Sequence, residues 1–164
     1  MNPNETSLLL SLAQVAVAFA GFSAIVVLFG RGDSGRWRRA QADRFHGMVV
    51  HAMVAVLFCL LPLLAGVFST DRALIWNVVS AVLGIEIVLH VTAVLFLASS
   101  ADTRIRMSVG VGYLVAVVLF MNVAGVMFNH EFRAYLIGVL WHVIMSGLLF
   151  VMLIWVPRAE VDSD

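Results

Sequence analysis

The chain has 164 residues, of which 62% are apolar and only 12% are charged, and its mean hydropathy is +1.02. Soluble domains are nearer half apolar and a quarter charged, so this composition predicts an integral membrane protein. The formal net charge is zero, which excludes a basic field that would recruit nucleic acid. All ten basic residues are arginines, and without a lysine the chain cannot form a Schiff base, as a retinal-binding protein must. The single Cys59 excludes an internal disulfide.

Five long apolar runs follow one another along the chain, and about 20 such residues cross the hydrocarbon core of a bilayer as a helix. The runs lie at about residues 7–29, 47–68, 73–98, 109–128 and 135–156. Only helices and closed barrels can span lipid, and none of the runs alternates in the manner of a strand. We therefore predict an all-α integral membrane protein with five transmembrane helices, forming a single membrane domain over residues 1–164.

The arginines are unevenly distributed between the two sides that these spans define. Eight lie in the loop at 30–46, in the segment after the third run and in the tail, whereas only Arg72 and Arg133 lie on the other side. Cytoplasmic segments are enriched in arginine, so the N-terminus is expected outside and the C-terminus inside. The tail, 157–164, also carries acidic residues and would be cytoplasmic.

The basic cytoplasmic loop at 30–46 contains three closely spaced arginines, Arg36, Arg38 and Arg39. One interpretation is that these residues only anchor the topology. The other is that they bind anionic lipid headgroups, which attract basic segments next to a membrane. The use of arginine without lysine, together with many alanines and valines, suggests a GC-rich bacterial genome. We therefore expect the bacterial inner membrane as the location.

The first apolar run contains two tracks of small residues at helical spacing. One consists of Ser7, Ser11, Gln14, Ala18 and Gly21, and the other of Ala13, Ala16, Ala20 and Ala24. Small residues let helix backbones approach closely in lipid. This helix is therefore predicted to lie at the centre of the bundle or at a subunit interface of a homo-oligomer.

Pro62 interrupts the backbone hydrogen bonding of the second run. Proline has no N–H, so the carbonyl of Phe58, four residues earlier, loses its helical partner. Two consequences are open: the helix is simply kinked, or the freed carbonyl lines a cavity.

Glu86 is the only formally charged residue inside the five runs, and His90 follows it by one helical turn. Ionisable residues within a membrane are costly and usually face the interior of the bundle, which makes them candidates for function. At a rise of about 1.5 Å per residue, Glu86 falls near the midplane, and other polar residues fall above and below it. In order from outside, the predicted polar column comprises Gln14, Asn122 and His142, then Glu86, His90 and His51. Tyr113 falls near the level of His51.

Three functions fit this pattern. The best guess for an active function is a channel or a proton or ion pathway in a homo-oligomer, because relays use carboxylates and imidazoles. The second is an assembly or accessory subunit in which Glu86 and His90 only satisfy each other. The third is a membrane redox protein in which His51 and His90 hold a haem, or His51, His90 and Glu86 hold a divalent metal. The sequence contains no nucleophile elbow, phosphate loop or histidine-rich box, so an enzyme is not favoured.

Overall fold

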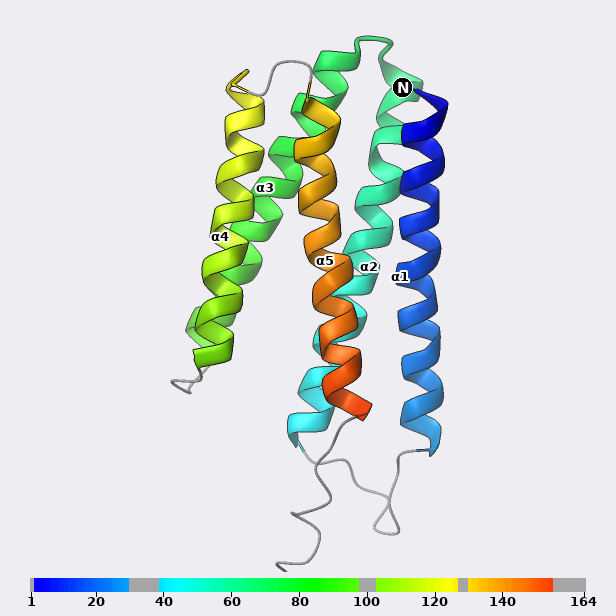
Figure 1. Cartoon of the computed structure of the whole chain (residues 1–164), viewed down its shortest axis with the longest axis vertical. Helices are drawn as coiled ribbons and strands as arrows, with labels where there is room; N and C mark the ends of the chain where they lie inside the picture. Colours follow the sequence, from blue (N-terminus) through cyan, green and yellow to red (C-terminus); the bar gives the residue numbers. More distant parts are fainter. Residues whose placement is uncertain (1, 30–38, 98–102, 127–129, 155–164) are drawn as a thin grey trace, which may run out of the picture.

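The computed structural model describes residues 2–29, 39–97, 103–126 and 130–154. Within these ranges the chain forms five helices and no strand, so the all-α prediction is confirmed (Figure 1). The helices are α1 (Pro3–Phe29), α2 (Arg39–Phe68), α3 (Arg72–Leu97), α4 (Thr103–Val123) and α5 (Glu131–Ile154).

Four of the helices are long and apolar enough to cross a membrane. These stretches are Pro3–Val26, Ala42–Phe68, Arg72–Phe96 and Glu131–Ile154. In α4 the corresponding apolar stretch is shorter, Met107–Val123, and it ends before the predicted limit of 128.

The early end of α4 is explained by a glycine cap. Gly125 has φ 78°, in the left-handed region that glycine adopts without a steric cost. The N–H of Val126 donates to the carbonyl of Met121, and the N–H of Gly125 donates to that of Asn122. This pair of hydrogen bonds is a Schellman motif, which satisfies the last carbonyls and ends the helix.

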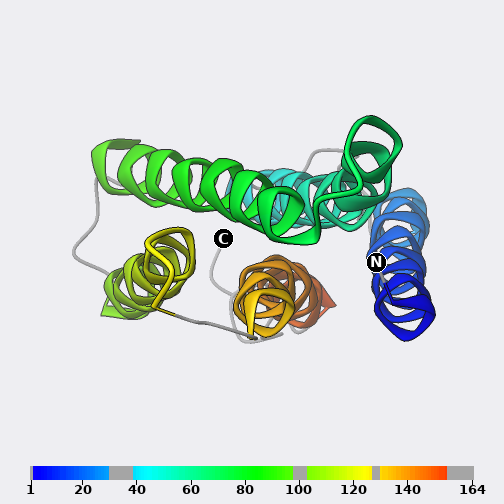
Figure 2. The same cartoon turned by 90° about the horizontal axis from the view of Figure 1, so that it is seen from above.

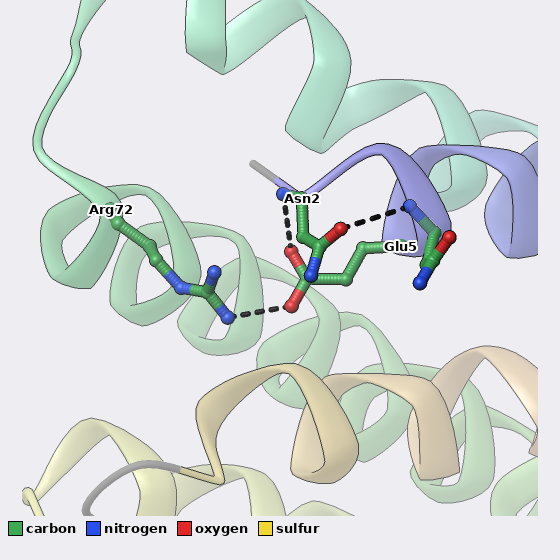
Figure 3. A network of polar contacts seen from close by, with 4 residues as sticks. Asn2, Glu5 and Arg72 are labelled. Carbon is green, nitrogen blue, oxygen red and sulfur yellow. Dashed lines mark hydrogen bonds and ion pairs between the residues drawn. The ribbon is translucent and has the colours of Figure 1, made fainter.

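The start of α1 is capped and attached to α3 (Figure 3). The side-chain oxygen of Asn2 accepts a hydrogen bond from the N–H of Asn4, and Glu5 Oε2 accepts one from the N–H of Asn2 at 3.0 Å. This is a capping box, in which two of the free N–H groups at a helix start are satisfied. The other oxygen of Glu5 pairs with the guanidinium of Arg72 at 2.6 Å, so the first turns of α1 and α3 are held together.

The five helices are arranged as two antiparallel pairs and one flanking helix (Figures 1 and 2). The pair α3–α4 lies beside the pair α2–α5, and α1 packs on α2 and α5 at the edge. Seen from above, α3 runs obliquely across the other helices rather than parallel to them. The core between the pairs contains large side chains from several helices, among them Trp76, Leu83, Ile87, Leu119 and Tyr135, all fully buried.

The position of α1 corrects one of the two predicted locations, because this helix does not occupy the bundle centre. In one of its two small-residue tracks, Ala13 and Ala16 are buried, Ala20 is half-buried and Ala24 is exposed; Ala16 packs with Ala52, Ala55 and Val143. The other track, with Gln14, is exposed along its whole length. A helix at the edge of the bundle has only one face to bury.

Some predicted features lie outside the described residues. They are Arg36 and Arg38 in the basic loop, and the acidic tail at 157–164. Arg39 is the first residue of α2, but its side chain is not among those described.

Candidate functional site

Four ionisable side chains from three helices meet inside the bundle. His51 comes from α2, Glu86 and His90 come from α3, and His142 comes from α5. We refer to these four residues as the Glu86 cluster. The structure therefore brings together four of the six residues of the predicted polar column.

His142 occupies the centre of the cluster, since each of its ring nitrogens contacts a different partner. Its Nε2 lies 2.9 Å from Oε2 of Glu86, and its Nδ1 lies 3.0 Å from Nδ1 of His51. The contact between the two imidazoles is a hydrogen bond in which one ring must donate and the other accept. The contact with Glu86 has the distance of an ion pair but not the alignment of a hydrogen bond, so both of its atoms keep unused hydrogen-bonding capacity.

His90 closes the cluster on the other side of Glu86. Its Nδ1 lies 3.9 Å from Oε1 of Glu86, which is a weaker contact than that of His142. Its ring is packed against that of His51, with 4.6 Å between centroids, and is 6.3 Å from that of His142. Glu86 therefore has a histidine beside each carboxylate oxygen, one from its own helix and one from α5.

The four members differ in exposure. The side chains of Glu86 and His90 are 26% and 23% exposed, whereas His142 is fully buried and His51 is only 5% exposed. Glu86 and His90 share one face because they are four residues apart on α3. This face lies at the border of the packed side of the helix, so the cluster extends from a partly open carboxylate to a closed pair of imidazoles.

Glu86 and His142 are in contact, although the depths expected for untilted helices place them apart. Those depths separate the two residues by about 10 Å along the membrane normal. Because α3 runs obliquely to its neighbours, residues at unequal positions along their helices can still meet (Figure 2). Tilt is decided by packing between helices and cannot be obtained from helix length.

The other two residues of the predicted column lie elsewhere. Asn122, on α4, is buried and donates from Nδ2 to Oγ of Ser80 at 3.0 Å. Ser80 precedes Glu86 by six residues, or about 9 Å of helix. Gln14 lies on the exposed face of α1. Tyr113, expected near the level of His51, pairs instead with the hydroxyl of Thr92 at 2.8 Å on an exposed surface.

The two helices that carry His51 and His142 are joined by further polar contacts. Ser146 donates to the carbonyl of Met48 at 3.1 Å, and Tyr135 donates to the carbonyl of Phe58. Near the end of the pair, Arg44 donates to the carbonyl of Met152 at 3.1 Å. The seam between α2 and α5 is thus a series of side-chain contacts, with the imidazole pair among them.

The sequence interpretation missed Tyr135 and did not assign Ser146 to the polar column. The available signal was their spacing: Ser146 follows His142 by four residues and Tyr135 precedes it by seven, so all three lie near one face of a helix. Pro62 was a second signal, because the carbonyl that it frees is the one that Tyr135 contacts. That carbonyl is satisfied by a side chain of a neighbouring helix.

The geometry bears on the cofactor hypothesis. Among the described residues, no group of three or more His, Cys, Asp or Glu side chains is arranged to hold a metal ion. The rings of His51 and His90, the pair that the haem hypothesis uses, are packed against each other with 4.6 Å between centroids, so a haem between them would require the two rings to move apart. In this arrangement the cluster is a chain of ionisable groups in contact.

Comparison of the chain with protein-family models, with curated proteins and with solved structures finds no match. The argument for function therefore rests on the residues of the Glu86 cluster and on the helices that position them.

Proposed function

We propose that the protein spans a membrane and transfers protons through the Glu86 cluster. The observation that carries this proposal is the position of His142 between an acid and a second imidazole, in contact with both. An imidazole can accept a proton at one nitrogen and release one from the other, which is the requirement for a relay. Carboxylate and histidine chains serve this purpose in membrane pumps and transporters.

The differences in exposure suggest the direction of transfer within the cluster. Glu86 and His90 are the two partly exposed members, at the surface of the bundle, so we infer that protons enter and leave the cluster through them, along the proposed subunit interface. His142 and His51 are buried: the proton passes from Glu86 to His142 and then to His51 along the two contacts of the His142 ring, and His51 would release it to His90, whose ring packs against it. If Glu86 had only a structural role, a carboxylate would not be needed at the edge of the packed face of α3. An uncharged partner for His142 would cost less in an apolar interior.

The proposal also includes the orientation of the protein in the membrane, its location and its partners. Four long apolar helices and the bias in arginine support a multi-pass protein with its N-terminus outside, in a bacterial inner membrane. A homo-oligomer is supported by the exposed track of α1, where the amide of Gln14 would otherwise face hydrocarbon. The arginines Arg36, Arg38 and Arg39 would bind anionic headgroups on the cytoplasmic side.

The test is proton flux into vesicles that contain the purified protein and a pH-sensitive dye, driven by a potassium diffusion potential. We expect a flux that Glu86→Gln reduces by roughly a hundredfold, since removing a relay group of this kind costs about 10²–10⁴-fold. Glu5→Gln is the matched control, because it removes a carboxylate at a helix end and should leave the flux unchanged.

The other outcomes separate the alternatives. Absence of flux at every pH and voltage, with Glu86→Gln impairing assembly alone, would overturn the relay in favour of an accessory subunit. Stoichiometric metal or visible absorption in the purified protein, lost in Glu86→Gln, would favour a cofactor site instead.

A further inference from the structure

The carbonyl of Phe58 is an unusual feature of α2, because Pro62 deprives it of its helical hydrogen bond. An unpaired carbonyl inside an apolar bundle is unfavourable. The hydroxyl of Tyr135, on α5, donates to this oxygen, and both Phe58 and Tyr135 are buried. The proline on one helix thus creates a specific acceptor for the tyrosine on the other.

This hydrogen bond has a fixed relation to the imidazole pair. Phe58 follows His51 by seven residues, and Tyr135 precedes His142 by seven, on helices that run in opposite directions. Seven residues are about two turns, or roughly 10.5 Å, and return to nearly the same face of a helix. The Tyr135 bond therefore constrains how far α2 and α5 can slide or rotate at the level of the two histidines.

A second bond limits the same movement from the opposite direction. Ser146, four residues after His142, donates to the carbonyl of Met48, three residues before His51. Tyr135 also packs on Trp76 of α3, with ring centroids 5.5 Å apart, and Trp76 precedes Glu86 by ten residues on that helix. Tyr135, like the two histidines of this seam, thus also contacts the helix that carries the carboxylate.

We propose that Tyr135 is a positioning residue for the relay: by binding the carbonyl that Pro62 frees, it holds His51 and His142 in hydrogen-bond contact. A slide of about 1 Å between the helices would break a contact of 3.0 Å. The inference rests on the proposed function for its effect on flux. Its effect on the imidazole pair can be measured whether or not the protein conducts protons.

The experiment uses the full chain in lipid bilayers with ¹⁵N-labelled histidine. Solid-state NMR reports the Nδ1 signals of His51 and His142 and the coupling between them, and vesicle flux is measured in parallel. In Tyr135→Phe we expect the Nδ1 signals to shift, their correlation to be lost, and flux to fall by roughly tenfold or more, as expected for misplaced reacting groups. Tyr113→Phe is the matched control, since Tyr113 is exposed and bonds only Thr92 among the described contacts.

A second variant tests whether Tyr135 positions the histidines or only gives the Phe58 carbonyl a hydrogen-bond donor. Pro62→Ala returns an N–H to α2 that can bond the Phe58 carbonyl within the helix. In the double variant Tyr135→Phe with Pro62→Ala, we expect thermal stability to recover while the histidine correlation and the flux stay reduced. Recovery of all three would overturn the inference, because the bond would then only satisfy the carbonyl.

Two further outcomes are decisive. If folded Tyr135→Phe keeps both the wild-type histidine correlation and the wild-type flux, the positioning role is refuted. If the wild-type protein shows no flux but Tyr135→Phe still disrupts the histidine correlation, the proposed proton transfer fails and the positioning role of Tyr135 stands.

Discussion

His142 on α5 and Glu86 on α3 contact each other at 2.9 Å, although they are separated by 56 positions and belong to different helix pairs. The sequence suggested a different partner for Glu86, namely His90 on its own helix. His90 is also adjacent, at 3.9 Å, but the closer contact crosses the bundle. A carboxylate that contacts a buried imidazole of another helix is coupled to the packing of the whole protein.

His142 should be the most sensitive residue of the cluster. We expect His142→Asn to abolish flux, because asparagine cannot accept a proton at one atom and release it from another. Unfolding should become easier by about 1–3 kcal/mol, since Nδ1 of His51 loses its buried partner. Flux and thermal unfolding in detergent measure the two effects. His130→Asn, at an exposed position before α5, is the control and should change neither; equal effects from both substitutions would refute a specific role of His142.

Two glycines of α4 should respond differently to alanine. A Cβ at Gly112 would lie 2.5 Å from a methyl of Val91 and 3.2 Å from the ring of Trp141, whereas at Gly110 it would meet nothing within 4 Å. Val91 is buried and stiff, so Gly112→Ala should cost about 1–3 kcal/mol. Gly110→Ala should be neutral or stabilise by about 0.5–1 kcal/mol, since alanine favours the helix. Thermal denaturation of the two variants compares them, and equal stability would contradict the close packing of α3 on α4.

The ion pair between Glu5 of α1 and Arg72 of α3 should be more sensitive to substitution of Glu5 than of Arg72. Glu5 both pairs with Arg72 and completes the capping box, whereas the side chain of Arg72 is half exposed. Glu5→Ala should therefore destabilise by about 1 kcal/mol or more, and Arg72→Ala by less, because an exposed ion pair contributes about 0–1 kcal/mol. Chemical denaturation measures both. Proton flux should be unaffected, and a larger effect of Arg72→Ala would contradict the capping role of Glu5.

The pair Ser80–Asn122 should contribute to stability and not to flux. In Ser80→Ala the buried Nδ2 of Asn122 loses its acceptor, which should cost about 1–3 kcal/mol. Adding Asn122→Leu removes the orphaned amide, so the double variant should recover much of that stability. A double-mutant cycle on unfolding tests this coupling. Loss of flux in a stable double variant would return Asn122 to the proton pathway.

Part of the candidate site was accessible from the sequence. Glu86 stands out because it is a charge in an apolar run, and His90 follows from helical periodicity. His51 and His142 were included for their depth in the membrane. Asn122 and Gln14 had equally suitable depths, yet one bonds Ser80 and the other lies on the exposed face of α1. Depth along a helix is a property of sequence position, but the direction in which a residue faces depends on its neighbours.

The end of α4 is a second feature that the apolar pattern of the sequence did not predict. By hydropathy the fourth run extends to 128, because the sequence stays apolar past Val123, where the helix ends. The helix ends at Val123, since Gly125 adopts a left-handed conformation that satisfies the last carbonyls.

By itself, the sequence determined that this protein is helical and apolar, with an ionisable residue inside the apolar run of its third helix. These properties follow from local periodicity and from the cost of exposing backbone and charge in an apolar medium. Only the tertiary structure decided that His142 contacts Glu86 and that Tyr135 donates a hydrogen bond to the carbonyl of Phe58. Both depend on the oblique crossing of α3 and on the register of α2 against α5. Crossing angle and register result from the packing of side chains between helices that are distant in sequence.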